Sequence, residues 1–260
     1  MPCHDRQLDN AFEAISWWRT FAGTTETCSV SGTGAIQELE LALAQIHQVA
    51  RVTAVSSGTA ALLCSMLALN VQPGTRVLVP GAVWPAARIA AQTLGAEVVE
   101  LSDWTKKSIA AGLASRNPIV ISVPEPHNQA NFAEIANQLT ASGIPVIEDL
   151  AALPKPAGLN GKLATISLGS GKAINAGEGG AILTNDHDLA DSIERISQHP
   201  VRQALRGLQP NPNALCLRMH PVAAVVALHA IVRGNGAQAN PNLRPAQTPL
   251  HIRTQRARAS

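Results

Sequence analysis

Lys172 lies in the segment "SLGSGKAINAGEGG", residues 167–180, among glycines and small residues. A phosphate-binding P-loop needs a glycine five positions before the Gly-Lys pair and a Ser or Thr after the lysine. Ile166 and Ala173 occupy these two positions, which argues against a nucleotide triphosphatase. Two interpretations remain for Lys172: a lysine that forms a Schiff base with a carbonyl group, or a lysine that solvates a surface turn.

Asp149 stands at the end of "IPVIED", where an apolar run stops and a loop is expected. Ligands of open α/β sheets collect at the carboxyl ends of strands. An aspartate there can pair with a protonated pyridine nitrogen, although an ordinary acid at a loop entry fits this short motif equally well. Glu148 should point to the opposite face of the strand, because strand side chains alternate.

The stretch "SSGTAALL", residues 56–63, joins the apolar run "RVTAVS" to a helix-like segment. A helix that begins at Gly58 and Thr59 would present free N–H groups and a hydroxyl to a phosphate. A capped helix start without a ligand is the alternative. Ser167 is a second candidate hydroxyl close to the lysine. Trp84 follows another strand end and is a candidate to stack on a planar ring, although buried tryptophans are more often part of the core.

A lysine, a buried carboxylate, a phosphate-binding helix start and a stacking aromatic are what pyridoxal phosphate chemistry requires of a protein. All four are present in one chain. The chain has no tyrosine, which excludes Tyr-Lys dehydrogenase chemistry. The glycine string "GTGAIQ" lacks both a preceding strand and a third glycine, so it does not support a dinucleotide-binding unit. The four cysteines form no C-x-x-C pair, and no metal site is expected.

Short apolar runs alternate with helix-like stretches from about residue 51, which predicts an α/β protein. The expected strands are "RVTAVS", "RVLVP", "AEVVEL", "PIVISV", "PVIED", "LATISL" and "AILTN". "GTAALLCSMLAL" and "PVAAVVALHAIV" should be buried helices, and "NDHDLADSIERISQH" a capped surface helix. We expect an N-terminal helical arm over residues 1–30, a large domain over 31–235 and a polar, arginine-containing disordered tail over 236–260.

Composition limits the class of protein. In 260 residues, 46% are hydrophobic, and the net charge is +2. The hydrophobic content indicates a globular protein. No export signal is expected, because the N-terminal segment has charges of both signs and no apolar core, and no membrane span, because "PVAAVVALHAIV" is too short. The dispersed cysteines fit free thiols in the cytoplasm. Nucleic acid is not an expected partner, because the arginines of the tail are few and dispersed.

Several longer segments have a more specific likeness. They include "SSGTAALLCSMLALNVQPGTRVLVPGAVW", "IPVIEDLAA", "GKLATISLGSGKAINAGEGGAILTND" and "LRMHPVAAVVAL". Together with "SGTGAIQELELALAQI" and "LGAEVVELSD", they resemble the DegT/DnrJ/EryC1/StrS family of sugar aminotransferases over roughly residues 31–230. This family is a branch of the fold-type-I pyridoxal phosphate enzymes. The resemblance implies a fold-type-I large domain with a mostly parallel seven-stranded sheet between helices.

The resemblance also implies roles for the candidate residues. Lys172 would form the Schiff base and move the proton, Asp149 would pair with the pyridine nitrogen, and Glu178 would be structural. The residues expected to bind pyridoxal phosphate are Gly58, Thr59, Trp84, Asp149, Ser167 and Lys172. The expected reaction moves an amino group from an amino acid donor, glutamate, to a keto-sugar or a related keto substrate. Related dehydratases have a histidine in place of this lysine, so the lysine favours amino transfer over dehydration. A homodimer is the expected assembly.

Some positions depart from the family pattern. Ala152 replaces a Gln or His that contacts the cofactor, and Cys216 replaces an asparagine that reaches the phosphate of the neighbouring subunit. Most of the family's small C-terminal domain is also expected to be missing. Two alternatives therefore stay open: a truncated, non-catalytic homologue that serves as a partner subunit, and a pyridoxal phosphate enzyme of another reaction type.

Overall fold

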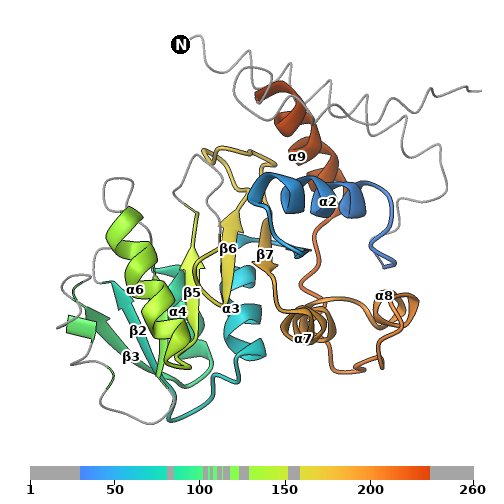
Figure 1. Ribbon diagram of the computed structural model, residues 1–260. Coiled ribbons are helices and arrows are strands. Elements are labelled where there is room, and N and C mark those ends of the chain that lie inside the picture. Colours follow the sequence, from blue (N-terminus) through green and yellow to red (C-terminus); the bar gives the residue numbers. More distant parts are fainter. Residues whose placement is uncertain are drawn as a thin grey trace, which may run out of the picture.

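The computed structural model describes residues 30–80, 85–101, 105, 108–109, 113, 118–122, 129–151 and 159–234. A single mixed sheet of seven strands runs through this part of the chain, in the order β1-β7-β6-β5-β4-β2-β3 (Figure 1). The strands are β1 (Arg51–Val55), β2 (Arg76–Pro80), β3 (Glu97–Leu101), β4 (Pro118–Ser122), β5 (Val146–Asp149), β6 (Leu163–Ser167) and β7 (Gly180–Thr184). The helices are α2 (Ala35–His47), α3 (Gly58–Ala68), α4 (Ala86–Thr93), α6 (Gln129–Ala141), α7 (His187–Ser197), α8 (Pro200–Leu205) and α9 (Pro221–Gly234).

Alternation of strands with helices confirms the predicted α/β class. Strands β2 to β6 pair in parallel, whereas β7 runs antiparallel to both of its neighbours, β1 and β6. One consequence concerns the edge of the sheet. Gly180, the first residue of β7, is in register with Val55 and Ser167, the last residues of β1 and β6. The turn before β7 therefore reaches the edge at which the parallel strands end.

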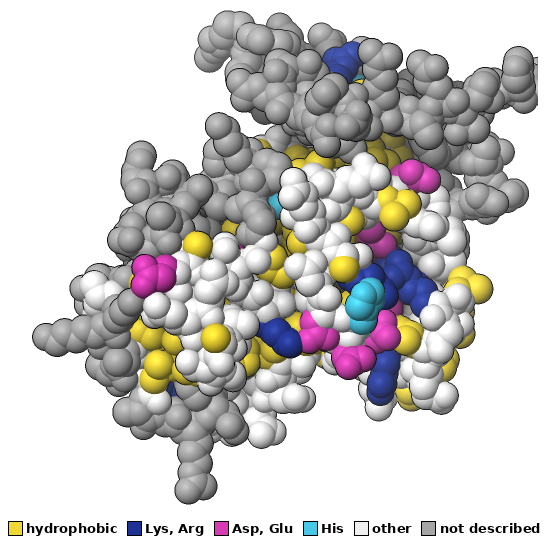
Figure 2. All heavy atoms as spheres, in the orientation of Figure 1, with side chains coloured by type: hydrophobic (Ala, Val, Ile, Leu, Met, Phe, Trp, Pro, Cys, Tyr) yellow, Lys and Arg dark blue, Asp and Glu magenta, His cyan; other side chains and the backbone are white. Residues whose placement is uncertain are grey.

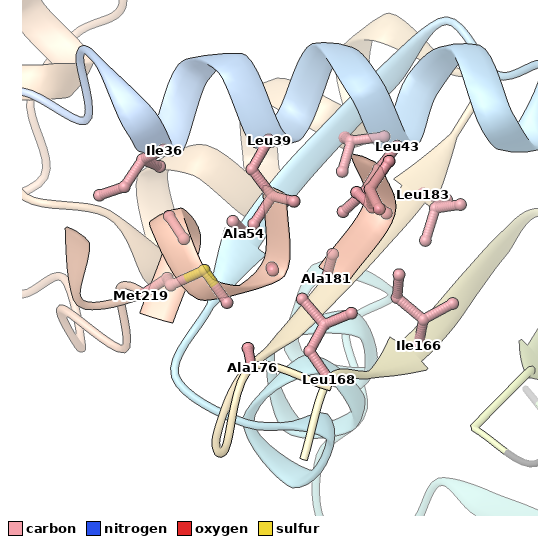
Figure 3. Packing of buried hydrophobic residues seen from close by; sticks show 14 of the residues in the cluster. Ile36, Leu39, Leu43, Ala54, Ile166, Leu168, Ala176, Ala181, Leu183 and Met219 are labelled. Carbon is pink, nitrogen blue, oxygen red and sulfur yellow. The ribbon is translucent and has the colours of Figure 1, made fainter. Parts of the chain in front are cut away.

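Two apolar layers cover the sheet around β1, β6 and β7. One layer packs α3, α4 and α7 against residues such as Val55 and Leu163. On the other face, α2 directs Ile36, Leu39 and Leu43 at the sheet (Figure 3). Because both faces are covered, every residue of β7 is buried.

The helices follow the local signals that predicted them. Ser57 caps α3, and its hydroxyl accepts a hydrogen bond of 3.1 Å from the Ala60 N–H. Asp186 caps α7 in the same way by accepting from the Leu189 N–H at 3.0 Å. The apolar "PVAAVVALHAIV" segment forms α9, which packs beside α2. No helix within the described ranges is long and apolar enough to cross a membrane.

A buried ion network joins α2, α7 and α8. Arg202 is only 1% exposed, and its guanidinium donates to Glu40 at 2.8 Å and to Glu194. Arg206 donates to Glu40 at 3.1 Å. Burial raises the pKa of the Glu40 carboxyl, while the two arginines oppose this shift. On the surface over α7 and α8, charged side chains of both signs also gather (Figure 2). The network joins α2 to helices that are distant from it in sequence, and Glu40 also accepts a hydrogen bond of 2.8 Å from the Ala54 N–H of β1.

Candidate active site

Asp149 is the last residue of β5 and is largely shielded from solvent. Its Oδ1 accepts a hydrogen bond of 3.1 Å from the Ala151 N–H, so the carboxylate is anchored to the turn that follows the strand. Burial raises the pKa of the Asp149 carboxyl, and the Ala151 N–H, the charge of Lys172 and the Thr165 hydroxyl partly offset the increase. A positively charged ligand group at this carboxylate would therefore stabilise its ionised form.

The N-terminus of α3 lies at the same edge of the sheet. β1 ends at Val55, and α3 begins three residues later at Gly58. The N–H groups of Gly58 and Thr59 are the first of the helix and have no carbonyl of the preceding turn to bind. Thr59 is exposed. These donors, together with the helix dipole, favour an anion at this position.

Gly58 makes a close approach that requires glycine. A Cβ at Gly58 would lie 2.9 Å from the Cβ of Ser167 and 3.3 Å from its Oγ. A Cβ at Gly180 would lie 2.5 Å from the carbonyl carbon of Ser57 and 2.7 Å from the nitrogen of Gly58. The start of α3, the end of β6 and the start of β7 are therefore in backbone contact, and the Ser167 hydroxyl faces the start of the helix.

Lys172 lies on the turn between β6 and β7, which we call the lysine loop, residues 168–179. The loop is closed at its base by a bond of 2.9 Å from the Leu168 N–H to the Gly179 carbonyl. A second bond of 2.8 Å runs from the Ala176 N–H to the Leu168 carbonyl. Within this loop the Lys172 N–H donates to the Gly169 carbonyl at 3.2 Å. Lys172 is half-buried and close enough to Asp149 for its positive charge to lower the pKa of that carboxyl.

A comparison with protein families assigns the chain that carries these residues to one of them. The model of the DegT/DnrJ/EryC1/StrS aminotransferase family matches residues 24–239. The chain belongs to this family. Enzymes of the family use pyridoxal phosphate.

Individual relatives agree with this assignment. The chain is 29% identical over 191 residues to 3-amino-5-hydroxybenzoate synthase of Amycolatopsis mediterranei (strain S699), covering 69% of this chain and 46% of the relative. It is 33% identical over 178 residues to UDP-2-acetamido-2-deoxy-3-oxo-D-glucuronate aminotransferase of Pseudomonas aeruginosa, covering 63% and 49%. The chain thus spans about half the length of the curated relatives that it matches.

Solved structures show the same fold. The aminotransferase from Psychrobacter cryohalolentis superposes with a TM-score of 0.72 at 21% identity, over 86% of this chain and 61% of that one. NtdA from Bacillus subtilis, solved with bound cofactor PMP, superposes with a TM-score of 0.67 at 18% identity, over 87% and 53%. The fold-type-I aminotransferase fold is therefore shared.

Not every candidate residue can be located. Trp84 and Ala152 lie outside the described residues, as do residues 1–29 and 235–260, which hold the predicted arm and tail. Cys216, where the resemblance predicts the family asparagine, has a left-handed backbone with a φ of 52°. Asparagine tolerates this conformation better than most side chains, so the backbone here would also suit an asparagine.

Glu148 precedes Asp149 on β5, and its side chain lies on the opposite face of the strand, as predicted. Glu148 is 1% exposed, and its Oε1 accepts from the N–H groups of Asn160 and Gly161. Burial raises the pKa of the Glu148 carboxyl. This side chain fastens the segment that leads into β6 and does not share the face of Asp149. Glu178 is exposed on the lysine loop.

Thr165 was not singled out from the sequence. It is in register with Asp149 across the parallel pair of β5 and β6. Its side chain is 1% exposed, and its hydroxyl makes no hydrogen bond within the described part of the chain. Strand alternation places Thr165 on the same face as Ser167, two residues later. That spacing was the available signal, but it gains meaning only when the register with β5 is known.

Proposed function

We propose that residues 31–235 form the cofactor-binding large domain of a pyridoxal phosphate-dependent aminotransferase. The amino group would pass from an amino acid donor, glutamate, to a keto-sugar or a related keto substrate. The observation that carries this proposal is the meeting of Lys172, Asp149 and the start of α3 at one edge of the sheet. Family membership supports the reaction class.

The residues present fit the cofactor. The close approach of Gly58 to Ser167 sets the Ser167 hydroxyl next to the first N–H groups of α3, and together these donors suit a phosphate. Asp149, at the end of β5, offers a carboxylate at the same edge of the sheet for the protonated nitrogen of the ring. Gly58, Thr59 and Ser167 would hold the phosphate, and Trp84 would stack on the ring.

Pyridoxal phosphate supplies an aldehyde that links to amino groups and a ring that withdraws electrons from the reacting carbon. Asp149 would bind the protonated ring nitrogen, and the positive charge of that nitrogen would favour the ionised carboxylate against the burial that raises its pKa. Lys172 would hold the cofactor through its Nζ and then carry a proton to and from the substrate carbon. The hydrogen bonds that close the lysine loop at its base would hold this lysine at the edge of the sheet.

The proposal for the substrates rests on the named relatives. One relative acts on a nucleotide-linked keto-sugar, and another is an L-glutamine:scyllo-inosose aminotransferase of Streptomyces griseus. A keto-sugar or cyclitol acceptor and a glutamate-type donor are consistent with these names, as is a role in amino-sugar or secondary-metabolite biosynthesis. We further propose a homodimer in the cytoplasm, in which the partner subunit completes the site.

An absorbance experiment tests the proposal. The full chain is mixed with pyridoxal phosphate, and the visible band of the bound cofactor is followed before and after the addition of glutamate or glutamine. We expect a band that Lys172→Ala abolishes, that Asp149→Asn weakens, and that the amino donor removes in the wild type. A band that neither donor changes would contradict amino transfer, and the absence of any lysine-dependent band would favour a non-catalytic homologue.

A further inference from the structure

Thr165 and Asp149 occupy opposing positions in the centre of the sheet. The two residues are partners in the register of β5 and β6, and the Leu150 N–H following Asp149 donates to the Thr165 carbonyl at 2.8 Å. Neighbouring strands of a sheet lie about 5 Å apart. The backbone of Thr165 is therefore fixed directly beside the turn that carries the carboxylate.

Both side chains lie on the face of the sheet that α3 covers. Leu163 and Ile147 belong to the apolar layer beneath α3, while Ala164 belongs to the layer on the opposite face. Because side chains alternate along a strand, Thr165 shares the face of Leu163, and Asp149 shares the face of Ile147. The hydroxyl and the carboxylate thus belong to the same layer as the start of α3.

The Thr165 hydroxyl is buried and needs a hydrogen-bond partner. Thr165 is 1% exposed, and its Oγ1 makes no hydrogen bond with the described residues. A buried hydroxyl without a partner costs free energy that a small apolar residue would avoid. On the carboxylate, Ala151 engages Oδ1, so the other oxygen remains for a second donor.

We propose that Thr165 is a positioning residue for Asp149: its hydroxyl donates to the ionised carboxylate and, with the Ala151 N–H, orients it toward the cofactor ring. The inference rests on the proposed function. Thr165 acts through Asp149 and does not itself touch the reacting atoms. The same hydroxyl lowers the pKa of the Asp149 carboxyl, as does Lys172, the charged side chain that acts on it from the lysine loop.

The test uses the cofactor-free full chain. The pKa of Asp149 is measured by NMR from its carboxyl carbon, assigned as the resonance that Asp149→Asn removes. We expect Thr165→Val, which keeps the shape of threonine, to raise this pKa, and Thr165→Ser to keep it at the wild-type value. Thr165→Ala removes the same hydroxyl and should act in the same direction if the valine variant does not fold. Thr53→Val, a buried threonine of β1, serves as the matched control and should leave the pKa unchanged.

A second readout is the dissociation constant for pyridoxal phosphate. We expect it to rise roughly threefold to tenfold in Thr165→Val, as the loss of one hydrogen bond implies, and to recover in Thr165→Ser. A folded Thr165→Val protein with an unchanged Asp149 pKa would overturn the inference. The titration needs no cofactor, so its result is independent of the proposed function. The proposed function fails instead if the wild type forms no lysine-dependent complex or if neither amino donor changes its absorbance.

Discussion

Replacing Gly180 with alanine places a methyl group against the backbone that begins α3. The added Cβ would lie 2.5 Å from the Ser57 carbonyl carbon and 2.7 Å from the Gly58 nitrogen. Carbon atoms at rest are about 3.5 to 4.0 Å from their neighbours, so the start of α3 must move by about 1 Å relative to β7. The first N–H groups of the helix would move with it, away from Ser167 and the lysine loop.

The substitution is expected to weaken the hydrogen bonds that the start of α3 makes to the phosphate of the cofactor. A hydrogen bond to a charged group contributes about 1.5 to 3 kcal/mol. Losing one such bond weakens binding roughly tenfold to a hundredfold, since a tenfold change is about 1.4 kcal/mol. Pyridoxal lacks the phosphate but keeps the aldehyde that Lys172 would engage. Gly180→Ala should therefore weaken the binding of pyridoxal phosphate by that factor. It should change the affinity for pyridoxal by less than about threefold.

The assay is a titration of each protein with each compound, followed by the lysine-dependent absorbance. Gly169→Ala, in the lysine loop, is the matched control, because a Cβ there would make an ordinary contact of 3.5 Å with the Oγ of Ser167. This control should bind both compounds nearly as the wild type does. An equal loss for both compounds in a folded Gly180→Ala protein would refute the reasoning, and so would an unchanged affinity for pyridoxal phosphate.

Two further predictions concern stability. Arg202→Leu should lower the free energy of unfolding by about 3 to 5 kcal/mol, because it leaves the carboxylates of Glu40 and Glu194 buried without their main partner. Arg51→Ala, which removes an exposed ion pair, should cost less than about 1 kcal/mol in the same denaturant titration, and equal losses would contradict this account. Burial lowers the pKa of His47 from 6.5 to about 4, so the unfolded chain takes up this proton first as the pH falls. Stability should decline by up to about 3 kcal/mol between pH 6.5 and pH 4 on this account, and less steeply in His47→Phe. Parallel stability curves for the two proteins would show that His47 does not cause the decline.

Local signals in the sequence were enough to place the main candidate residues. An apolar run that stops at Asp149 predicts a strand end, and Gly58 after another run predicts a helix start; the structure has both features. These signals extend over only a few residues, and strands such as β1, β2 and β4 are each followed along the chain by a helix. The α/β class and the edge on which the candidates lie could therefore be predicted.

Contacts between distant segments could not be predicted in the same way. The reversed direction of β7 brings Gly180 to the edge with Ser57, and no local pattern specifies the direction of a strand. Arg202 and Glu40 are 162 residues apart, so their ion pair appears only when α2 and α8 are packed. Thr165 likewise looked like any strand residue, because its relation to Asp149 depends on the register between β5 and β6.

The central claim, that Lys172 is the residue that holds the cofactor, can be tested by chemical trapping. Borohydride reduction makes the reversible link between a lysine and an aldehyde permanent, and peptide mass spectrometry then identifies the modified lysine. The account predicts that pyridoxal phosphate is trapped on Lys172 and that Lys172→Ala incorporates none. Trapping on another residue, such as the exposed Lys162, or no trapping in the folded wild-type protein, would contradict it.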